Sequence, residues 1–146
     1  MNIGFLGLGK LGLPVSLAVE NKGHRIFGYD ISKQTLEDIR KRKIRYREEW
    51  VDKYLPNTKL EINDIDQLVK NSEIIFVPIQ TPHDPQYEGI TRIPKKRIDF
   101  DYSYLKSGIR DLSSAIEKNG EDKVVIIIST VLPGTIRSQI KPLLGK

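Results

Sequence analysis

The sequence predicts a doubly wound α/β domain, in which helices cover both faces of a parallel sheet. Two observations lead to this prediction. Apolar runs of strand length alternate with helical patterns along the chain, and most of these runs are continuous, as in strands buried on both faces. Right-handed crossovers between such strands produce the doubly wound arrangement. The length of 146 residues suits a single domain.

The first expected strand covers residues 2–7, a short apolar run that ends in glycine. A helix is expected over residues 10–21, because apolar side chains recur there at helical spacing and Gly23 is a suitable C-terminal cap. Residues 25–29 form the second apolar strand. Ser32 is the expected N-terminal cap of the next helix, since its hydroxyl can accept a bond from a free N–H group.

The middle of the chain consists of shorter elements. The helix after the second strand is expected to end near residue 41. A short helix over residues 48–55 is stopped by Pro56, which cannot continue it. Residues 59–62 are expected to form a weak third strand, and residues 64–70 a short helix.

The last third of the chain contains the strongest strand signals. Residues 73–79, EIIFVPI, and residues 123–129, KVVIIIS, are rich in β-branched side chains and predict strands on either side of an amphipathic helix over residues 102–117. A last helix is expected over residues 134–144. Residues 83–99 show no periodicity, and a connection of this length is expected to be functional or mobile.

The composition excludes several classes of site. The chain has no cysteine, so disulfides, thiolate metal sites and cysteine nucleophiles are excluded within it. His24 and His83 are its only histidines, and no metal site is predicted. No apolar run approaches the roughly 20 residues of a membrane-spanning helix. The N-terminal residues lack the features of a signal peptide, and a cytoplasmic location is expected.

The charge balance favours anionic partners. Twenty-four Lys and Arg residues against nineteen Asp and Glu residues give a net charge of +5, which suits nucleotides among other anions. Six of the eight residues from Arg40 to Arg47 are basic. This run is interpreted as a solvated helix end and loop. A nucleic-acid patch and a contact with the phosphates of a bound nucleotide are the two alternatives.

A G-x-G-x-x-G motif follows the first expected strand. It is formed by Gly7, Gly9 and Gly12, with Lys10 and Leu11 between the last two. Gly7 permits a tight turn, Gly9 lets the backbone approach a diphosphate, and Gly12 allows close packing of helix and strand. Because the motif ends a strand and opens a helix, it predicts a Rossmann-type dinucleotide site in which these five residues contact the cofactor. A purely structural turn is the alternative.

Asp30 ends the second expected strand, 21 residues after Gly9. An acidic residue at this place accepts hydrogen bonds from the hydroxyls of the adenosine ribose and repels a 2′-phosphate, so NAD is predicted rather than NADP. Arg25 and Lys33 lie nearby and weaken this preference. The alternative role for Asp30 is to cap the following helix, which Ser32 can also do.

Two later motifs lie where ligands bind in an open α/β sheet, at the carboxyl ends of strands. Residues 77–82 read V-P-I-Q-T-P, and residues 129–135 read S-T-V-L-P-G-T. Together with G-L-G-K-L-G-L-P and G-Y-D, these motifs resemble the N-terminal NAD-binding domain of the UDP-glucose/GDP-mannose dehydrogenase family. Its members typically read G-x-G-Y-V-G-L-P, T-P and S-T-V-x-P-G-T. The resemblance covers essentially the whole chain.

The resemblance implies an activity and further site residues. Members of this family oxidise the C6 hydroxyl of a nucleotide sugar to a carboxylate with two NAD. By this resemblance Gln80 and Thr81 line the adenosine side of the cofactor, and Ser129 also belongs to the cofactor site. Thr130 lies near the nicotinamide and the catalytic water, and is the one expected catalytic residue. The alternative for Thr130 is a hydroxyl that caps the next helix.

Departures from the family pattern limit this expectation. The family's catalytic cysteine, lysine and asparagine, its central dimerising helix and its sugar-binding domain are absent from these 146 residues. We therefore expect one NAD-binding domain over residues 1–146, incomplete for catalysis alone, which meets a nucleotide sugar only with a second domain. A homo-oligomer or partner chain is expected as well.

Two other functions remain open from the sequence. One is a non-catalytic nucleotide-binding or interaction module that keeps the fold without the chemistry. The other is a 6-phosphogluconate-type hydroxyacid dehydrogenase domain, against which the T-P and S-T-V-x-P-G-T motifs argue. Within the glycine motif itself, Lys10 replaces the tyrosine that the family often has.

Overall fold

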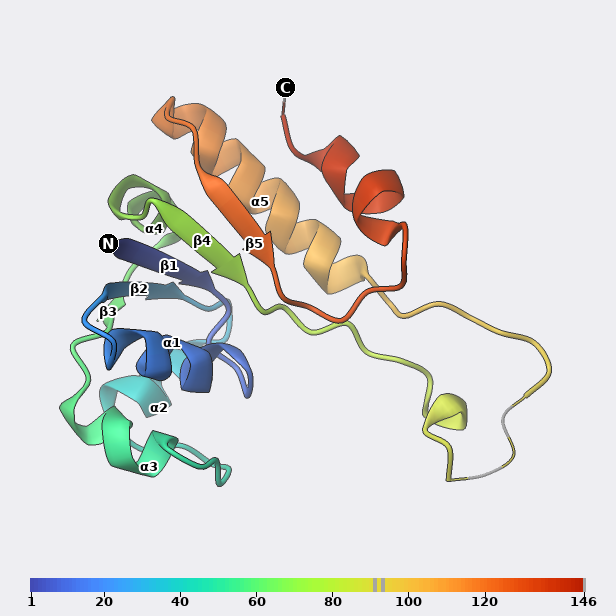
Figure 1. Cartoon of the computed structure of the whole chain (residues 1–146), viewed down its shortest axis with the longest axis horizontal. Coiled ribbons are helices and arrows are strands. Elements are labelled where there is room, and N and C mark those ends of the chain that lie inside the picture. Colours follow the sequence, from blue (N-terminus) through green and yellow to red (C-terminus); the bar gives the residue numbers. More distant parts are fainter. Residues whose placement is uncertain (91, 93, 146) are drawn as a thin grey trace.

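Five parallel strands form one sheet in the computed structural model, which describes residues 1–90, 92 and 94–145 (Figure 1). The strand order is β3-β2-β1-β4-β5. The strands are β1 (Asn2–Leu6), β2 (Arg25–Tyr29), β3 (Glu61–Ile62), β4 (Ile74–Val77) and β5 (Val124–Ile127). The predicted doubly wound sheet is confirmed. Positions 91 and 93 of the expected connection 83–99, and position 146 of the expected domain, lie outside the described residues.

Strand β1 lies at the centre and pairs with β2 on one side and β4 on the other. Because side chains alternate along a strand, Ile3 and Phe5 point to one face of the sheet and Leu6 to the other. Phe5 stacks on Phe76 of β4, with ring centroids 5.2 Å apart. The continuous apolar runs of the sequence therefore supply two hydrophobic cores, one on each face.

Helices α1 (Gly12–Glu20), α2 (Lys33–Arg40) and α3 (Val51–Tyr54) belong to the core on the first face. Leu13 and Leu17 of α1 are buried against the strands. The buried residues of this core are Ile3, Phe5, Leu8, Leu13, Leu17, Ile26, Ile39, Val51, Leu55 and Leu60.

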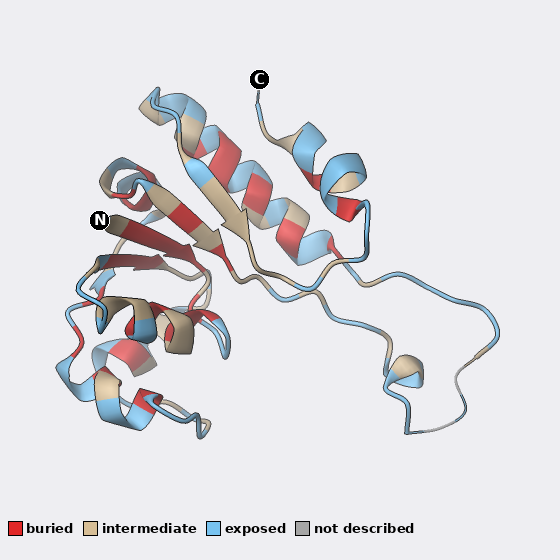
Figure 2. Ribbon diagram, in the orientation of Figure 1, coloured by how far each residue is buried: buried red, intermediate tan, exposed pale blue. Residues whose placement is uncertain are grey.

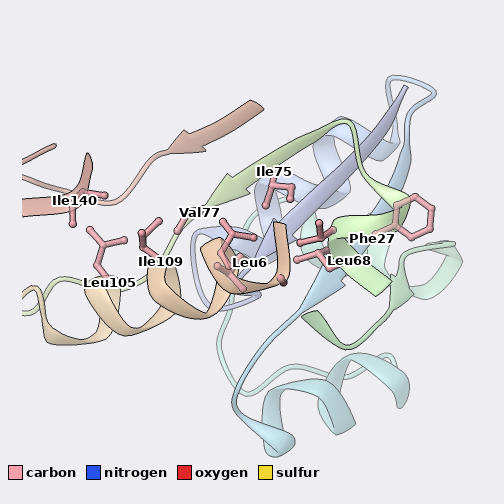
Figure 3. Close-up of a cluster of buried hydrophobic side chains, with 11 residues drawn as sticks. Leu6, Phe27, Leu68, Ile75, Val77, Leu105, Ile109 and Ile140 are labelled. Atoms are coloured by element: carbon pink, nitrogen blue, oxygen red, sulfur yellow. The ribbon is translucent and has the colours of Figure 1, made fainter. Parts of the chain in front are cut away.

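Helices α4 (Ile65–Asn71) and α5 (Ser103–Asn119) belong to the core on the second face. Figure 3 shows Leu105 and Ile109 of α5 directed toward Val77 of the sheet, with Ile140 beside them. The buried residues of this core are Leu6, Phe27, Leu68, Val69, Ile75, Val77, Leu105, Ile109, Leu112, Ala115 and Ile140.

The N-terminal cap expected for α2 is present, and glycines lie just beyond two of the helices. The Ser32 hydroxyl accepts a hydrogen bond of 3.2 Å from the Thr35 N–H and caps α2, as predicted. Gly23 and Gly120 have φ values of +91° and +75° beyond the ends of α1 and α5, a conformation that favours glycine.

Prolines shorten two of the expected elements. Strand β4 ends at Val77 because Pro78 has no N–H for the ladder. The last expected helix is instead a π-helical turn, Ile136–Ile140, followed by the 3₁₀ turn Lys141–Leu143. Pro142 lies in that 3₁₀ turn, where the missing N–H and the ring disfavour a continuing α-helix.

Trp50, just before α3, has a backbone φ of +73°. A side chain in this left-handed conformation costs about 1–2 kcal/mol, and glycine avoids the cost. We expect Trp50→Gly to be more stable than Trp50→Ala by about 1 kcal/mol in urea unfolding, since both variants lose the same indole. At Lys53, inside α3, the order of glycine and alanine should be reversed. Equal stabilities at position 50 would contradict the prediction.

The sheet is less covered at β5 than at its other strands. Val124 is 57% exposed, and the remaining residues of β5 are only half-buried, whereas Ile75 and Val77 of the neighbouring β4 are buried. Figure 2 shows this difference along the two strands. Strand β5 is also an edge of the sheet, so its outer backbone groups have no partner strand within the described chain.

The connection between β4 and α5 reaches away from the layered body of the protein (Figure 1). It contains the 3₁₀ turn Pro85–Tyr87 and returns to the body where the Asp101 N–H donates to the Pro82 carbonyl over 2.8 Å. Within the described ranges of the chain, no helix is long and apolar enough to cross a membrane. No cluster of three or more metal-ligating side chains occurs among the same residues.

Candidate functional site

The candidate site lies at the carboxyl ends of β1 and β4, where the chain connections leave the sheet in opposite directions. After β1 the chain continues to β2 and β3 on one side, and β4 and β5 lie on the other. Ligands in open α/β sheets bind at such a point. The turn after β1 meets Pro78 after β4, because a Cβ atom placed on Gly7 would be 3.5 Å from the Pro78 carbonyl oxygen.

The three glycines of the turn differ in how far the structure requires glycine at their positions. Gly7 has a φ of +117°, which side chains rarely adopt. A Cβ on Gly12 would overlap the Gly7 carbonyl oxygen and lie 2.9 Å from Cγ of Pro78, so only glycine fits there. A Cβ on Gly9 would meet nothing within 4 Å. Gly9 is therefore not required by the packing of the free protein, and it borders open space.

Helix α1 begins directly beside this open space. The Leu13 N–H donates to the Gly9 carbonyl over 3.0 Å, and this bond joins the turn to the helix. Lys10 and Leu11 are exposed on the turn, while Gly12 is buried as the first residue of α1. The positive end of the helix dipole and its free N–H groups suit a phosphate at this place.

Asp30 lies against the glycine turn. Its Oδ2 accepts a hydrogen bond of 2.7 Å from the Leu8 N–H, and its Oδ1 accepts one of 2.8 Å from the Ser32 N–H. Ser32, and not Asp30, caps α2. The carboxylate therefore joins the ends of β1 and β2, and each oxygen keeps a further lone pair for a ligand hydroxyl.

The segments after β4 and β5 are joined to each other at the same edge of the sheet. The Thr81 hydroxyl donates to the Thr130 carbonyl over 2.6 Å, and the Ser129 hydroxyl donates to the Val77 carbonyl over 3.1 Å. Gln80 and the Thr130 side chain are exposed. The structure thus brings the residues predicted after β4 and β5 together with the glycine turn around one end of the sheet.

Tyr102 is a residue of this region that the sequence analysis missed. It is 4% exposed, and its hydroxyl donates to Asp99 over 2.6 Å. The same oxygen accepts hydrogen bonds from the Leu132 N–H and the Thr135 hydroxyl, at 3.1 and 3.4 Å. The phenol therefore holds the loop after β5 to the end of the long connection. A tyrosine at the start of an amphipathic helix is the sequence signal for such a role, because a buried hydroxyl needs a hydrogen-bond partner.

We expect Tyr102→Phe to lower the free energy of unfolding by about 1–3 kcal/mol, because the Leu132 N–H and the Thr135 hydroxyl lose their acceptor inside the protein. Urea unfolding measures this loss. Tyr104→Phe is the matched control, since Tyr104 lies two residues away and is 53% exposed. Equal stability of the two variants would show that the bonds of Tyr102 are not needed.

The basic run from Arg40 to Arg47 starts at the last residue of α2, and two of its side chains contact acidic residues of that helix. Three of its cations are held by groups of the chain itself: Lys41 by Glu37, Arg42 by the Thr58 carbonyl and Arg45 by Asp38. This favours a solvated helix end and loop over a nucleic-acid patch. Within the run, the Tyr46 hydroxyl lies 3.5 Å from the Gly9 carbonyl oxygen.

His83 contacts its own connection. Its Nε2 lies 3.8 Å from the Glu88 carboxylate, and its ring packs edge-on against Phe100. Neither contact involves a residue of the glycine turn.

Known proteins resemble this chain over nearly its full length. The UDP-glucose/GDP-mannose dehydrogenase family, NAD binding domain, matches residues 1–146. GDP-mannose 6-dehydrogenase of Pseudomonas aeruginosa is 27% identical over 99% of this chain. UDP-N-acetyl-D-mannosamine dehydrogenase of Pyrococcus horikoshii is 30% identical over 92%. The chain spans only 32% and 30% of these two relatives.

Solved structures agree with this result. A ternary complex of GDP-mannose dehydrogenase from Pseudomonas aeruginosa superposes with a TM-score of 0.83 at 26% identity, over 98% of this chain and 31% of that one. The UDP-N-acetyl-mannosamine dehydrogenase of Pyrococcus horikoshii gives 0.75 at 29% identity, over 98% and 32%. The chain therefore belongs to the UDP-glucose/GDP-mannose dehydrogenase family, of which it is the NAD-binding domain.

Proposed function

We propose that the glycine turn holds the diphosphate of NAD and that Asp30 holds its adenosine ribose. The observation that carries this proposal is the position of the Asp30 carboxylate, which accepts a hydrogen bond from the N–H of Leu8, the residue before Gly9 in the turn. A carboxylate, which only accepts hydrogen bonds, suits ribose hydroxyls because each hydroxyl can donate one. The N-terminal end of α1, with Lys10 and Leu11 exposed beside it, suits the diphosphate.

The loops after β4 and β5 complete the proposed site. Gln80 and Thr81 line the adenosine side, and Ser129 and Thr130 lie toward the nicotinamide. When bound, NAD supplies a hydride acceptor. The Thr130 hydroxyl is exposed while its backbone is held by Thr81, so it is free to orient a water molecule or the nicotinamide amide.

We further propose that this domain is the cofactor half of a nucleotide-sugar 6-dehydrogenase, which transfers a hydride from a sugar alcohol to NAD. The names of the relatives support this class of substrate. Because these 146 residues lack a cysteine for the second oxidation, the nucleotide sugar and the remaining catalytic groups are assigned to a second domain.

Calorimetric titration of the chain with NAD and NADP tests the cofactor site. We expect NAD to bind at least about tenfold more tightly than NADP, because the Asp30 charge faces the 2′-phosphate. Gly9→Val should abolish binding of both without loss of stability, since its side chain fills space that the free protein leaves open. Failure of NAD to bind at millimolar concentration, or unchanged binding to Gly9→Val, would contradict the proposal.

A further inference from the structure

Tyr46 lies beside the glycine turn, Gly7 to Gly12, although it is distant from that turn in the sequence. Its hydroxyl lies 3.5 Å from the carbonyl oxygen of Gly9, a residue 37 positions earlier in the chain. Gly9 is also the glycine whose missing Cβ leaves open space in front of the turn. The ring of Tyr46 is half-buried at this place, so it forms part of the rim of the proposed diphosphate site.

The loop that carries Tyr46 is fixed on both sides. The adjacent Arg45 binds Asp38 of α2, with Nε 2.9 Å from the carboxylate. Arg42 donates to the Thr58 carbonyl over 2.9 Å, and Ile44 packs against the first hydrophobic core. These contacts hold the phenol beside the turn in the absence of any ligand.

The hydroxyl of Tyr46 is a donor with a poor acceptor. The phenol carries its proton at neutral pH, and burial, followed by the nearby negative charge of Glu48, raises the pKa of Tyr46 further. An O–H···O hydrogen bond is usually 2.5–3.0 Å long, and the distance to Gly9 exceeds that range. An anionic oxygen offers a stronger acceptor than this carbonyl.

Two further cations lie on the same segments. Lys10 is exposed within the turn, and Arg47 is exposed next to Tyr46. Among the residues that the structure describes, neither has a carboxylate oxygen within 4.0 Å, unlike Arg45. Their charges are therefore available to an anion at the rim, and the local field favours a phosphate there.

We propose that Tyr46 is a cofactor-binding residue whose hydroxyl donates to a diphosphate oxygen of the dinucleotide held at Gly9. The ligand class is a nucleoside diphosphate joined to a second group, as in NAD and ADP-ribose. The proposal rests on the proposed function and deepens it. It assigns a specific contact to the basic run, which otherwise serves as a solvated loop.

Titration of Tyr46→Phe with NAD, ADP-ribose and adenosine tests this contact. The change removes one hydroxyl and keeps the ring. We expect the Kd to rise about tenfold for NAD and ADP-ribose, and to stay unchanged for adenosine, which has no phosphate. Tyr54→Phe is the matched control, because Tyr54 is also a half-buried tyrosine and stacks on Trp50. The Kd of Tyr54→Phe for NAD should equal that of the unchanged chain.

The outcomes separate this inference from the proposed function. If the unchanged chain binds NAD and Tyr46→Phe binds it equally well, the Tyr46 contact is overturned and the cofactor site stands. An equal loss for adenosine would also overturn it, because the hydroxyl would then act through the shape of the site. If the unchanged chain binds neither NAD nor ADP-ribose, the proposed function falls and this inference falls with it.

Discussion

Replacing Gly12 by alanine is expected to destabilise the domain by about 3 kcal/mol or more. The new methyl group would overlap the Gly7 carbonyl oxygen and press on Cγ of Pro78, so the turn, the first residue of α1 and the segment after β4 would all have to move. Overpacking of this kind costs about 1–3 kcal/mol even where only side chains give way, and here the obstacle is backbone. Urea unfolding followed by circular dichroism measures the loss.

Gly9→Ala is the control that makes this result specific. It adds the same methyl group three residues earlier, where nothing lies within 4 Å, and its stability should change by less than about 0.5 kcal/mol. The same variant should bind NAD more weakly. A Gly12→Ala protein as stable as Gly9→Ala would show that helix and turn are looser than the structure describes.

Asp30→Ala is expected to raise the Kd for NAD about a hundredfold. The change removes a charged acceptor for the ribose hydroxyls, and hydrogen bonds to charged groups contribute about 1.5–3 kcal/mol each. It also frees the Leu8 N–H, which holds the turn in place. NADP should lose much less affinity, because the repulsion of its 2′-phosphate disappears together with the ribose contacts. The ratio of the two Kd values, measured by calorimetry, is therefore the decisive quantity.

Ser32→Ala separates these effects from simple damage to α2. It removes the cap of the helix next to Asp30, which should cost about 1 kcal/mol of stability, while the ribose contacts remain. Its preference for NAD over NADP should match that of the unchanged chain. If Asp30→Ala kept the same preference as Ser32→Ala, the carboxylate would not select the cofactor.

The sequence was sufficient to predict the sheet and the tight turn after β1. The turn at Gly7, the close packing at Gly12 and the place of Asp30 at the end of β2 were predictable because each depends on residues nearby in the sequence. The cap at Ser32 followed from the same local rules. The continuous apolar runs were enough to predict the parallel sheet. A strand that is buried on both faces is apolar along its whole length, whereas a strand with one solvated face alternates between apolar and polar residues.

Other features depend on contacts between distant segments. Two of the three partners of the Tyr102 hydroxyl lie 30 and 33 positions later, and Tyr46 meets a residue 37 positions earlier. No periodic pattern encodes such pairings. The last helix was predicted as one element, although Pro142 within it was visible in the sequence. The cofactor-binding roles of the glycine motif and Asp30 stay predictions, as do those of Gln80, Thr81, Ser129 and Thr130.

The central place of β1 has a consequence for how this chain folds. Its partner β4 lies far along the sequence, since Ile3 pairs with Ile74, and the Asn2 N–H bonds Glu73 across a separation of 71 residues. During synthesis, the β1 edge that pairs with β4 therefore has no partner strand until β4 has left the ribosome. The Phe5 ring likewise lacks its stacking partner until Phe76 has been made. The middle of the sheet is completed late, because long loops must close before these contacts form.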